Sequence, residues 1–234
     1  FFSDHGNNQS LRGKQFCYED GVHVPLLVWG DSASVVPGTI RDELVSTLDI
    51  SATTLSLAGV NLPTYLDGVD LFAPDFQART AAVSARDRCD YTIDRIRTVR
   101  TDQFRYIKNY HTDRPLLQAQ YRDHHPAVKD LKRLHDTGEL SPELDTMWFG
   151  KRAKEELYLL SEDPHQMKNL AGDPAYAEEL KRHRRQLNAW IQTTGDRGQR
   201  PEDANQLKAT YDLWKNKDIF KKAKTNPEYD PFRN

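Results

Sequence analysis

The front of the chain carries one long apolar run that is set between polar segments. Residues 22–29 are almost continuously apolar, a pattern typical of a strand buried on both faces of a sheet. The polar stretch 7–18 precedes it and is expected to be a long loop. A helix is expected within residues 41–59, with Asp49 as its N-cap and Gly59 at its left-handed end.

Shorter apolar runs follow and predict a second, antiparallel region. Residues 81–85 form a candidate strand, and residues 96–99 and 104–108 predict a hairpin. Residues 157–160 are expected to add a third antiparallel strand. Consecutive strands of this kind favour a small antiparallel sheet that is distinct from the front of the chain.

Three helices are expected after the hairpin, over residues 126–136, from Ser141 onward, and over residues 173–194. In the last of these, the apolar positions repeat at helical spacing up to Gly195. Residues 196–234 are polar and lysine-rich, so they are expected to lie on the surface. Their expected anchors are Tyr211, Trp214 and Phe220.

Composition narrows the class of protein. The 33 Lys and Arg nearly balance the 35 Asp and Glu, which argues against a nucleic-acid-binding protein or a polybasic membrane protein. No apolar run approaches the roughly 20 residues that a membrane helix needs. The two cysteines, Cys17 and Cys89, are too few for a disulfide framework. Locally, residues 95–133 carry an excess of Lys and Arg, which predicts either a basic rim for a polyanionic glycan or a solvated strand face.

Candidate chemistry lies near the start of the chain. Asp4 and His5 follow the expected strand end at Phe1-Phe2, at the edge where open α/β sheets bind ligands. The two side chains could hold a metal, or Asp4 could simply cap a turn. Lys14 lies in the same loop and could face a metal-bound anion, although most lysines are solvated.

These residues carry a resemblance. The segments FFSDHG and LRGKQFCYEDGVHVPLLVWG resemble the middle of a type I sulfatase of the alkaline-phosphatase-like superfamily. Two further segments resemble later sulfatase motifs in the same order, LVSTLDISATTLSLAGVNLPTYLDGVDL and ELYLLSEDPHQMKNLAGDP, so the similarity extends over residues 1–195. The segment RDRCDYTIDRIRTVRTDQFRYIKNY is similar to the heparan-sulfatase-like branch. Ala52, Leu159 and Gln166 depart from the usual motifs, outside the chemical centre.

The resemblance implies a fold. It is the C-terminal part of an alkaline-phosphatase-like α/β fold, a mixed sheet sandwiched by helices, followed by a small subdomain with an antiparallel sheet and a packed helix. Residues 1–80 would belong to the catalytic domain, residues 81–195 to the subdomain, and residues 196–234 to a surface tail.

The resemblance also implies site residues. Asp4 and His5 match the second pair of metal ligands, and the metal is usually calcium, although the imidazole leaves its identity open. Lys14 matches the lysine that holds a sulfate oxygen. The family's nucleophile is formylglycine, made from Cys or Ser in a C/S-x-P/A-x-R motif, and neither Cys17 nor Cys89 starts such a motif. The nucleophile is therefore expected upstream, in a missing N-terminal half that partners this chain, and the chain alone is expected to be inactive.

Four further residues are candidates for substrate binding. His23 opens the apolar run near the expected active-site rim, and His111 lies in the basic stretch. Arg86 and Arg88 follow the strand at residues 81–85 and could bind a substrate carboxylate or sulfate through two parallel hydrogen bonds. The alternatives are packing for His23 and an ion-pair network with Asp90 and Asp94 for the arginines.

The expected function is hydrolysis of a sulfate ester on a sulfated carbohydrate. The alternatives are a phosphodiesterase or phosphonate monoester hydrolase of the same superfamily, or a non-catalytic glycan-binding fragment. A nucleophile of plain Thr or Ser would favour the phosphorus chemistry. Family analogy implies a periplasmic, extracellular or lysosome-like location, with neither a nucleic acid nor a membrane as partner.

Overall fold

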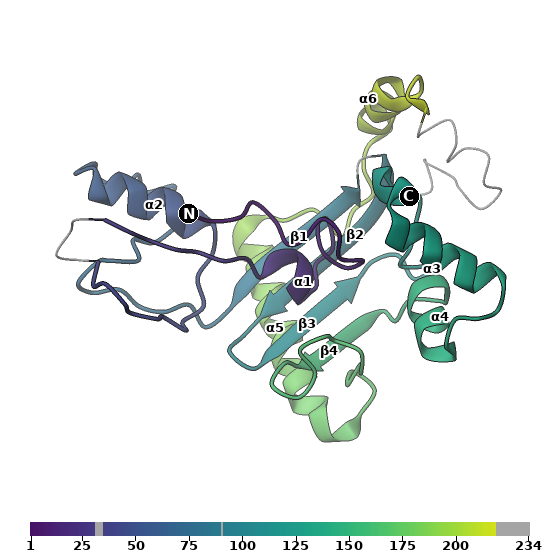
Figure 1. Cartoon of the computed structure of the whole chain (residues 1–234). Helices are drawn as coiled ribbons and strands as arrows, with labels where there is room; N and C mark the ends of the chain where they lie inside the picture. The colour runs from purple at the N-terminus through teal and green to yellow at the C-terminus, as the bar shows by residue number, and fades with distance from the viewer. Residues whose placement is uncertain (31–34, 90, 219–234) are drawn as a thin grey trace.

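A central sheet organises the molecule, with helix α5 behind it and the N-terminal loop and α1 in front (Figure 1). The computed structural model describes residues 1–30, 35–89 and 91–218. The elements in chain order are α1 (Glu19–Val22), α2 (Leu48–Leu57), β1 (Ala82–Cys89), β2 (Thr92–Arg100), β3 (Phe104–Asn109), the 3-10 helix η1 (Tyr121–His124), α3 (Pro126–Asp136), α4 (Pro142–Phe149), β4 (Glu155–Leu159), the 3-10 helix η2 (Pro174–Tyr176), α5 (Ala177–Thr194) and α6 (Ala204–Trp214).

The sheet has four antiparallel strands in the order β1-β2-β3-β4, so each strand pairs with its neighbours in sequence. The predicted hairpin is confirmed, with Val99 of β2 opposite Tyr106 of β3. The predicted third strand is confirmed as β4, where Leu157 also lies opposite Tyr106. The strand expected at residues 81–85 extends to Cys89 and forms an edge of this same sheet.

Each face of the sheet is covered by a hydrophobic cluster. On the front face, Phe16 and Tyr18 of the N-terminal loop pack with Ile107 and with Trp148 of α4. On the back face, Leu180 and Leu187 of α5 pack against β-strand residues such as Val99. Fully burying side chains of this size contributes about 1.5–3 kcal/mol each. Burial on both faces makes the sheet a rigid support for the loop.

The helices after the hairpin form where the sequence predicts them. Helix α3 covers the predicted range, and Ser141 caps α4 by accepting a hydrogen bond from the Leu144 N–H at 3.4 Å. Helix α5 ends at Gly195, whose φ is 67°. It begins only at Ala177, because residues 174–176 form the 3-10 helix η2 instead.

The prediction of a strand over residues 22–29 is wrong. Helix α1 ends at Val22. Within the described residues, the β-pairing of residues 22–29 is limited to a single bridge between Phe2 and Leu26. A strand needs neighbours that satisfy its backbone groups, and one bridge does not provide them. The side chain of Trp29 is 96% exposed, so this apolar run is not buried here.

The predicted helix within residues 41–59 is α2, and its N-cap is Thr47 rather than Asp49. Asp49 is buried, and its carboxylate accepts hydrogen bonds from the N–H groups of Ser46 and Val69 at 2.7 and 2.9 Å. It also pairs with Arg79. Burial would raise the pKa of Asp49, but these hydrogen bonds hold it below its usual value.

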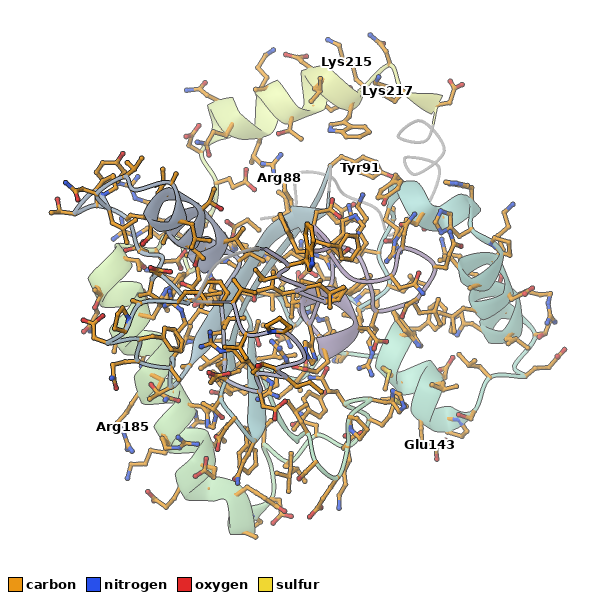
Figure 2. The ribbon with its side chains drawn as sticks, turned by 60° about the vertical axis from the view of Figure 1, so that its left-hand side comes forward. Arg88, Tyr91, Glu143, Arg185, Lys215 and Lys217 are labelled. Carbon is orange, nitrogen blue, oxygen red and sulfur yellow. The ribbon has the colours of Figure 1, made fainter. Side chains whose placement is uncertain are left out.

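Part of the expected surface tail forms helix α6, which has no buried residue and lies beyond the ends of β1 and β2. Asp203 caps α6, and Trp214 packs on Tyr91 with ring centroids 5.3 Å apart. Figure 2 shows Arg88 and Tyr91 facing α6, whereas Lys215 and Lys217 project from its end. The third expected anchor, Phe220, lies outside the described residues. In the part of the chain that the structure describes, no helix has the length and apolarity needed to cross a membrane.

Candidate functional site

The N-terminal loop, residues 3–19, carries Asp4, His5 and Lys14 and folds back on itself. The N–H of Lys14 donates to the carbonyl of Asn7 at 3.3 Å. A Cβ at Gly13 would lie 1.8 Å from that same carbonyl oxygen, so only glycine allows this approach. The loop therefore places Lys14 beside the segment that follows Asp4 and His5.

Asp4 and His5 present neighbouring ligand atoms. His5 Nδ1 lies 2.8 Å from the carbonyl oxygen of Gly6, and because a carbonyl only accepts, Nδ1 carries the proton. His5 Nε2 is then free to bind a metal, and it lies 3.5 Å from Asp4 Oδ2. The carboxylate of Asp4 is 81% exposed. The pair therefore fits one side of a metal site, because the tautomer of His5 leaves the Nε2 lone pair available to a metal ion.

This pair is not a complete metal site within the described residues. No group of three or more His, Cys, Asp or Glu side chains in that part of the chain could hold a metal ion. Two ligands do not suffice for calcium, which takes six to eight oxygens. Further ligands would have to be carbonyl or amide oxygens or water, or come from outside the described residues.

The ammonium group of Lys14 contacts an aromatic ring on one side. Its Nζ lies 5.5 Å from the centroid of the Tyr121 ring, a cation–π contact that leaves the other directions open. The Tyr121 hydroxyl in turn donates to Asn8 Oδ1 at 3.3 Å. Residues from η1 therefore help to orient the lysine.

Three arginines from the body of the molecule hold the loop, and we call them the arginine clamp: Arg86 of β1, Arg105 of β3 and Arg122 of η1. Arg122 donates to the carbonyls of Asn8, Ser10 and Leu11 at 3.0–3.4 Å. Arg86 donates to the carbonyl of Gln15 at 3.0 Å, and Arg105 donates to Glu19 at 2.8 Å. All three are at most 7% exposed. The guanidinium suits this role because it has five donors in one plane.

Glu19, at the end of the loop, is the anionic partner in a basic cluster. Burial alone would raise its pKa, but hydrogen bonds from His23 and Arg105 and the charge of Arg100 lower it to about 2. The hydrogen bond to Glu19 correspondingly raises the pKa of His23. The loop end is thus fixed by ion pairs at neutral pH.

The four candidate substrate residues do not form one group. The side chain of Arg86 is 6% exposed and lies 3.4 Å from Asp94, as the ion-pair alternative expected, whereas Asp90 lies outside the described residues. Arg88 pairs with Glu202 and Thr210, next to α6. His23 lies at the loop end, and its side chain is 75% exposed.

His111 is buried away from the loop. Burial and the nearby charges of Arg114 and Arg95 lower its pKa to about 4, so the imidazole is neutral at pH 7. Its Nε2 is buried without a hydrogen-bond partner among the described residues. A buried neutral ring of this kind does not present a charge to substrate.

The basic stretch is not a surface rim. Five of its arginines are at most 8% exposed, namely Arg95, Arg97, Arg105, Arg114 and Arg122. Arg97 pairs with Asp87 and Asp196, and Arg105 pairs with Glu19. Half of the positive charge in this stretch is therefore internal, and carboxylates balance Arg97 and Arg105.

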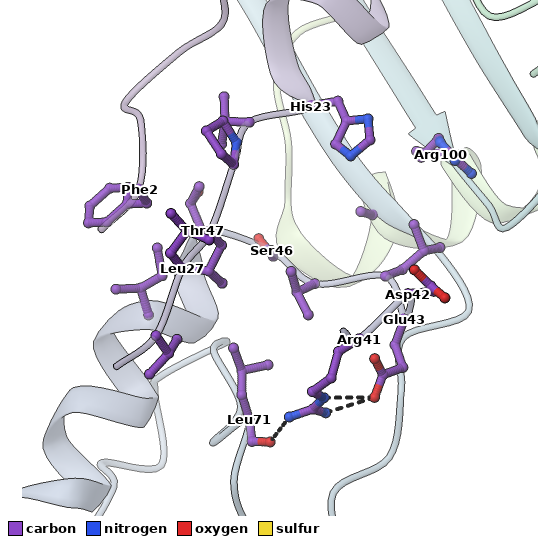
Figure 3. A pocket seen from close by; sticks show the side chains of 18 of the residues that line it. Phe2, His23, Leu27, Arg41, Asp42, Glu43, Ser46, Thr47, Leu71 and Arg100 are labelled. Carbon is purple, nitrogen blue, oxygen red and sulfur yellow. Dashed lines mark hydrogen bonds and ion pairs between the residues drawn. The ribbon is translucent and has the colours of Figure 1, made fainter. Parts of the chain in front are cut away.

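An open pocket of about 780 Å³ lies beside the loop, between residues 22–28 and 39–50 and the starting edge of the sheet (Figure 3). Its lining mixes apolar with polar and charged side chains, and His23 and Arg100 lie near one end. Asp4, His5 and Lys14 do not line it. The pocket therefore adjoins the loop at Glu19 but is not lined by the residues that carry the candidate chemistry.

Sequence reasoning missed Arg105, Arg122 and Tyr121, and it named Arg86 as a substrate or ion-pair residue without its contact to the loop. Arg122 lies more than one hundred residues from the carbonyls that it binds, so spacing along the chain carries no signal for it. Gln15 was also missed. Its φ of 75°, a strained conformation directly after Lys14, is visible only in the structure. Only the surplus of arginine in the middle of the chain hinted at these contacts.

Comparison with known proteins finds sulfatase relatives over most of this chain. The family model described as N-sulphoglucosamine sulphohydrolase, C-terminal, matches residues 8–125, which include Lys14 but not Asp4 and His5. An ulvan-active sulfatase of Formosa agariphila is 32% identical over 206 residues, covering 86% of this chain and 34% of that protein. Human N-sulphoglucosamine sulphohydrolase is 28% identical over 203 residues, covering 79% of this chain and 39% of that protein.

A solved structure described as a 2-O GAG sulfatase shares the fold, with a TM-score of 0.58, 22% identity, and coverage of 83% of this chain and 36% of that one. The chain thus spans between a third and two fifths of the length of these relatives. Because the family model covers just over half of the chain, the chain belongs to the sulfatase family whose C-terminal region that model describes.

Proposed function

We propose that this chain supplies the C-terminal part of a metal-assisted sulfuric ester hydrolase that acts on a sulfated carbohydrate. The observation that carries the proposal is the N-terminal loop, in which Asp4 and His5 lie 3.5 Å apart and buried arginines bind the backbone on both sides of Lys14. The names of the relatives support the substrate class, since one is an ulvan-active sulfatase and another acts on N-sulphoglucosamine.

In this proposal, Asp4 and His5 hold one side of a divalent metal, which family analogy suggests is calcium. The bound metal supplies positive charge to the sulfate oxygens. Lys14 binds a sulfate oxygen and stabilises the charge that develops as the ester bond breaks. The formylglycine nucleophile would come from the part of the relatives that this chain does not cover, so the chain alone is expected to be inactive.

The partner of the front of the chain would be that remaining part of the catalytic domain. Large apolar side chains are exposed there, namely Phe1, Leu27, Trp29, Ile40 and Tyr65. Exposed apolar side chains of this kind are typical of a surface that another part of a protein covers. By the same analogy, we propose a periplasmic, extracellular or lysosome-like location for the whole protein.

The test uses the full-length protein that contains this chain, assayed on a sulfated monosaccharide, a phosphodiester and a phosphonate monoester. We expect Lys14→Ala to lower kcat on the sulfate ester by about 10²–10³-fold, the range for loss of one group that stabilises the transition state. Asp4→Ala should weaken calcium binding in calorimetry. Lys181→Ala is the control, because this lysine is exposed on α5.

Three outcomes would contradict the proposal. Wild-type kcat in the Lys14→Ala variant would remove the lysine from the chemistry. Unchanged calcium affinity in Asp4→Ala would remove the metal role. Faster turnover of the phosphorus substrates than of the sulfate ester would assign the protein to phosphoryl transfer instead.

A further inference from the structure

Gln15, the residue after Lys14, has an unusual backbone conformation. Its φ of 75° lies in the left-handed region, which residues with a Cβ rarely adopt. Such positions persist only where surrounding contacts enforce them. What enforces Gln15 also sets the direction in which the neighbouring Lys14 leaves the loop.

Strand β1 holds both the main chain and the side chain of Gln15. Arg86 Nη1 donates to the Gln15 carbonyl at 3.0 Å, and Cys89 Sγ donates to Gln15 Oε1 at 2.9 Å. The pairing of β1 with β2 shifts register between Arg86 and Arg88, so the two contacts lie on either side of an irregularity. Irregularities of this kind re-aim side chains.

Arg86 is itself held firmly. Its Nη2 lies 3.4 Å from Asp94 Oδ2, and Arg152 binds the other oxygen of Asp94 at 2.5 Å. Its guanidinium also lies 4.9 Å from the centroid of the Phe16 ring, the next residue of the loop. Asp94 is fully buried. Arg86 therefore links a fixed ion-pair network to the backbone beside Lys14.

We propose that Arg86 is a positioning residue for Lys14, acting by holding Gln15 in the left-handed conformation. This inference rests on the proposed role of Lys14 at the sulfate. Arg86 fixes the backbone end of the lysine, and Tyr121 contacts its ammonium end. Loss of Arg86 would leave the lysine present but misdirected, so kcat should fall while substrate binding changes little.

The experiment compares variants of the full-length protein. We expect Arg86→Ala to lower kcat at least tenfold with KM within about twofold, and Arg86→Lys to recover part of the loss. Adding Arg86→Ala to Lys14→Ala should cause no further loss. Gln15→Gly should partly rescue Arg86→Ala, because glycine adopts a positive φ without strain.

Amide hydrogen exchange gives a readout that does not depend on activity. Exchange of residues 13–16 should speed up in Arg86→Ala and in Arg86→Lys. The matched control is Arg79→Ala, which removes the ion pair between Arg79 and the buried Asp49 of α2. That control should lower the melting temperature without changing kcat or exchange at residues 13–16.

The outcomes separate this inference from the proposed function. Wild-type kcat and unchanged exchange in a folded Arg86 variant, with Lys14→Ala impaired, would overturn the inference alone. Failure of Gln15→Gly to rescue would overturn the route through Gln15. Wild-type kcat in Lys14→Ala would overturn the proposed function, and exchange would then still report whether Arg86 orders the loop.

Discussion

At the scale of residues, buried arginines do much of the structural work in this protein. Arg97 is 2% exposed and binds Asp87 and Asp196, while Arg122 is 1% exposed and binds three loop carbonyls. A buried charge is tolerated only when it is paired or hydrogen-bonded, and the fixed plane of a guanidinium satisfies several acceptors at once. The arginine content therefore serves folding and loop order.

His111 makes stability depend on pH. Its pKa is about 4 in the folded protein and about 6.5 in an unfolded chain, so between these values the unfolded state binds more protons. As far as His111 is concerned, the free energy of unfolding has its full value above pH 6.5 and decreases as the pH falls toward 4. At pH 5 the loss is about 2 kcal/mol, at about 1.4 kcal/mol for each unit of pKa difference.

Melting temperatures of the full-length protein at pH 7 and pH 5 check this expectation. His111→Gln should show a smaller drop between the two pH values than the wild type. His124→Gln, at an exposed histidine, should show the wild-type drop. An identical drop in all three proteins would contradict the assignment.

At the scale of elements, the N-terminal loop is ordered without being helix or strand over most of its length. Its order comes from close backbone approach and from the arginine clamp. A long loop held in this way can present side chains in a fixed geometry, as catalytic sites require. The loop should therefore be sensitive to small changes at its closest contacts.

Gly13→Ala tests that sensitivity. The added Cβ would lie 1.8 Å from the carbonyl oxygen of Asn7, so the loop must open. We expect the free energy of unfolding to fall by about 2–4 kcal/mol, as for other severe steric changes, and kcat to fall with it. Gly172→Ala is the matched control, since nothing lies within 4 Å of its added Cβ. Equal effects of the two changes in denaturant unfolding would refute the close approach.

Helix α6 is a peripheral helix, and the contact of Trp214 with Tyr91 helps to hold it in place. Trp214→Ala removes its edge-to-face contact with Tyr91 and should increase amide exchange over residues 204–214 while exchange in the sheet stays unchanged. Leu213→Ala, at a side chain that is 67% exposed on the same helix, should have no effect. Protection of α6 that survives Trp214→Ala would show that other contacts hold the helix.

At the scale of the whole molecule, the chain is unevenly covered. The sheet is buried on both faces, by α5 on one and by the N-terminal loop and α4 on the other, whereas several large apolar side chains within residues 1–65 are exposed. The chain also spans only 34–39% of the two curated relatives described above. Both observations support the proposal that the remaining part of the catalytic domain covers these exposed apolar side chains.

The isolated chain should therefore bind a hydrophobic dye more strongly than the full-length protein does. Trp29→Lys in the isolated chain should reduce dye binding, because this side chain is 96% exposed in the apolar front. Leu213→Lys, on α6, should change it less. Equal dye fluorescence from the isolated chain and the full-length protein would contradict a covered front.

The sequence by itself determined the elements whose signals are local. The hairpin of β2 and β3, the start of α4 at Ser141 and the end of α5 at Gly195 follow from alternation, capping and glycine. The order of motifs also indicated the sulfatase family, which the family model confirms. These features depend on residues close together in the chain, so a linear pattern can carry them.

Only the tertiary structure decided which polar residues act together. The apolar run at residues 22–29 is not a strand here, because pairing depends on neighbours and not on the run itself. Arg86 was a candidate for substrate binding, and the structure places it behind the loop on Gln15 and Asp94. Hydrogen bonds and ion pairs between distant segments form only once the sheet has brought those segments together, and nothing in their spacing encodes them.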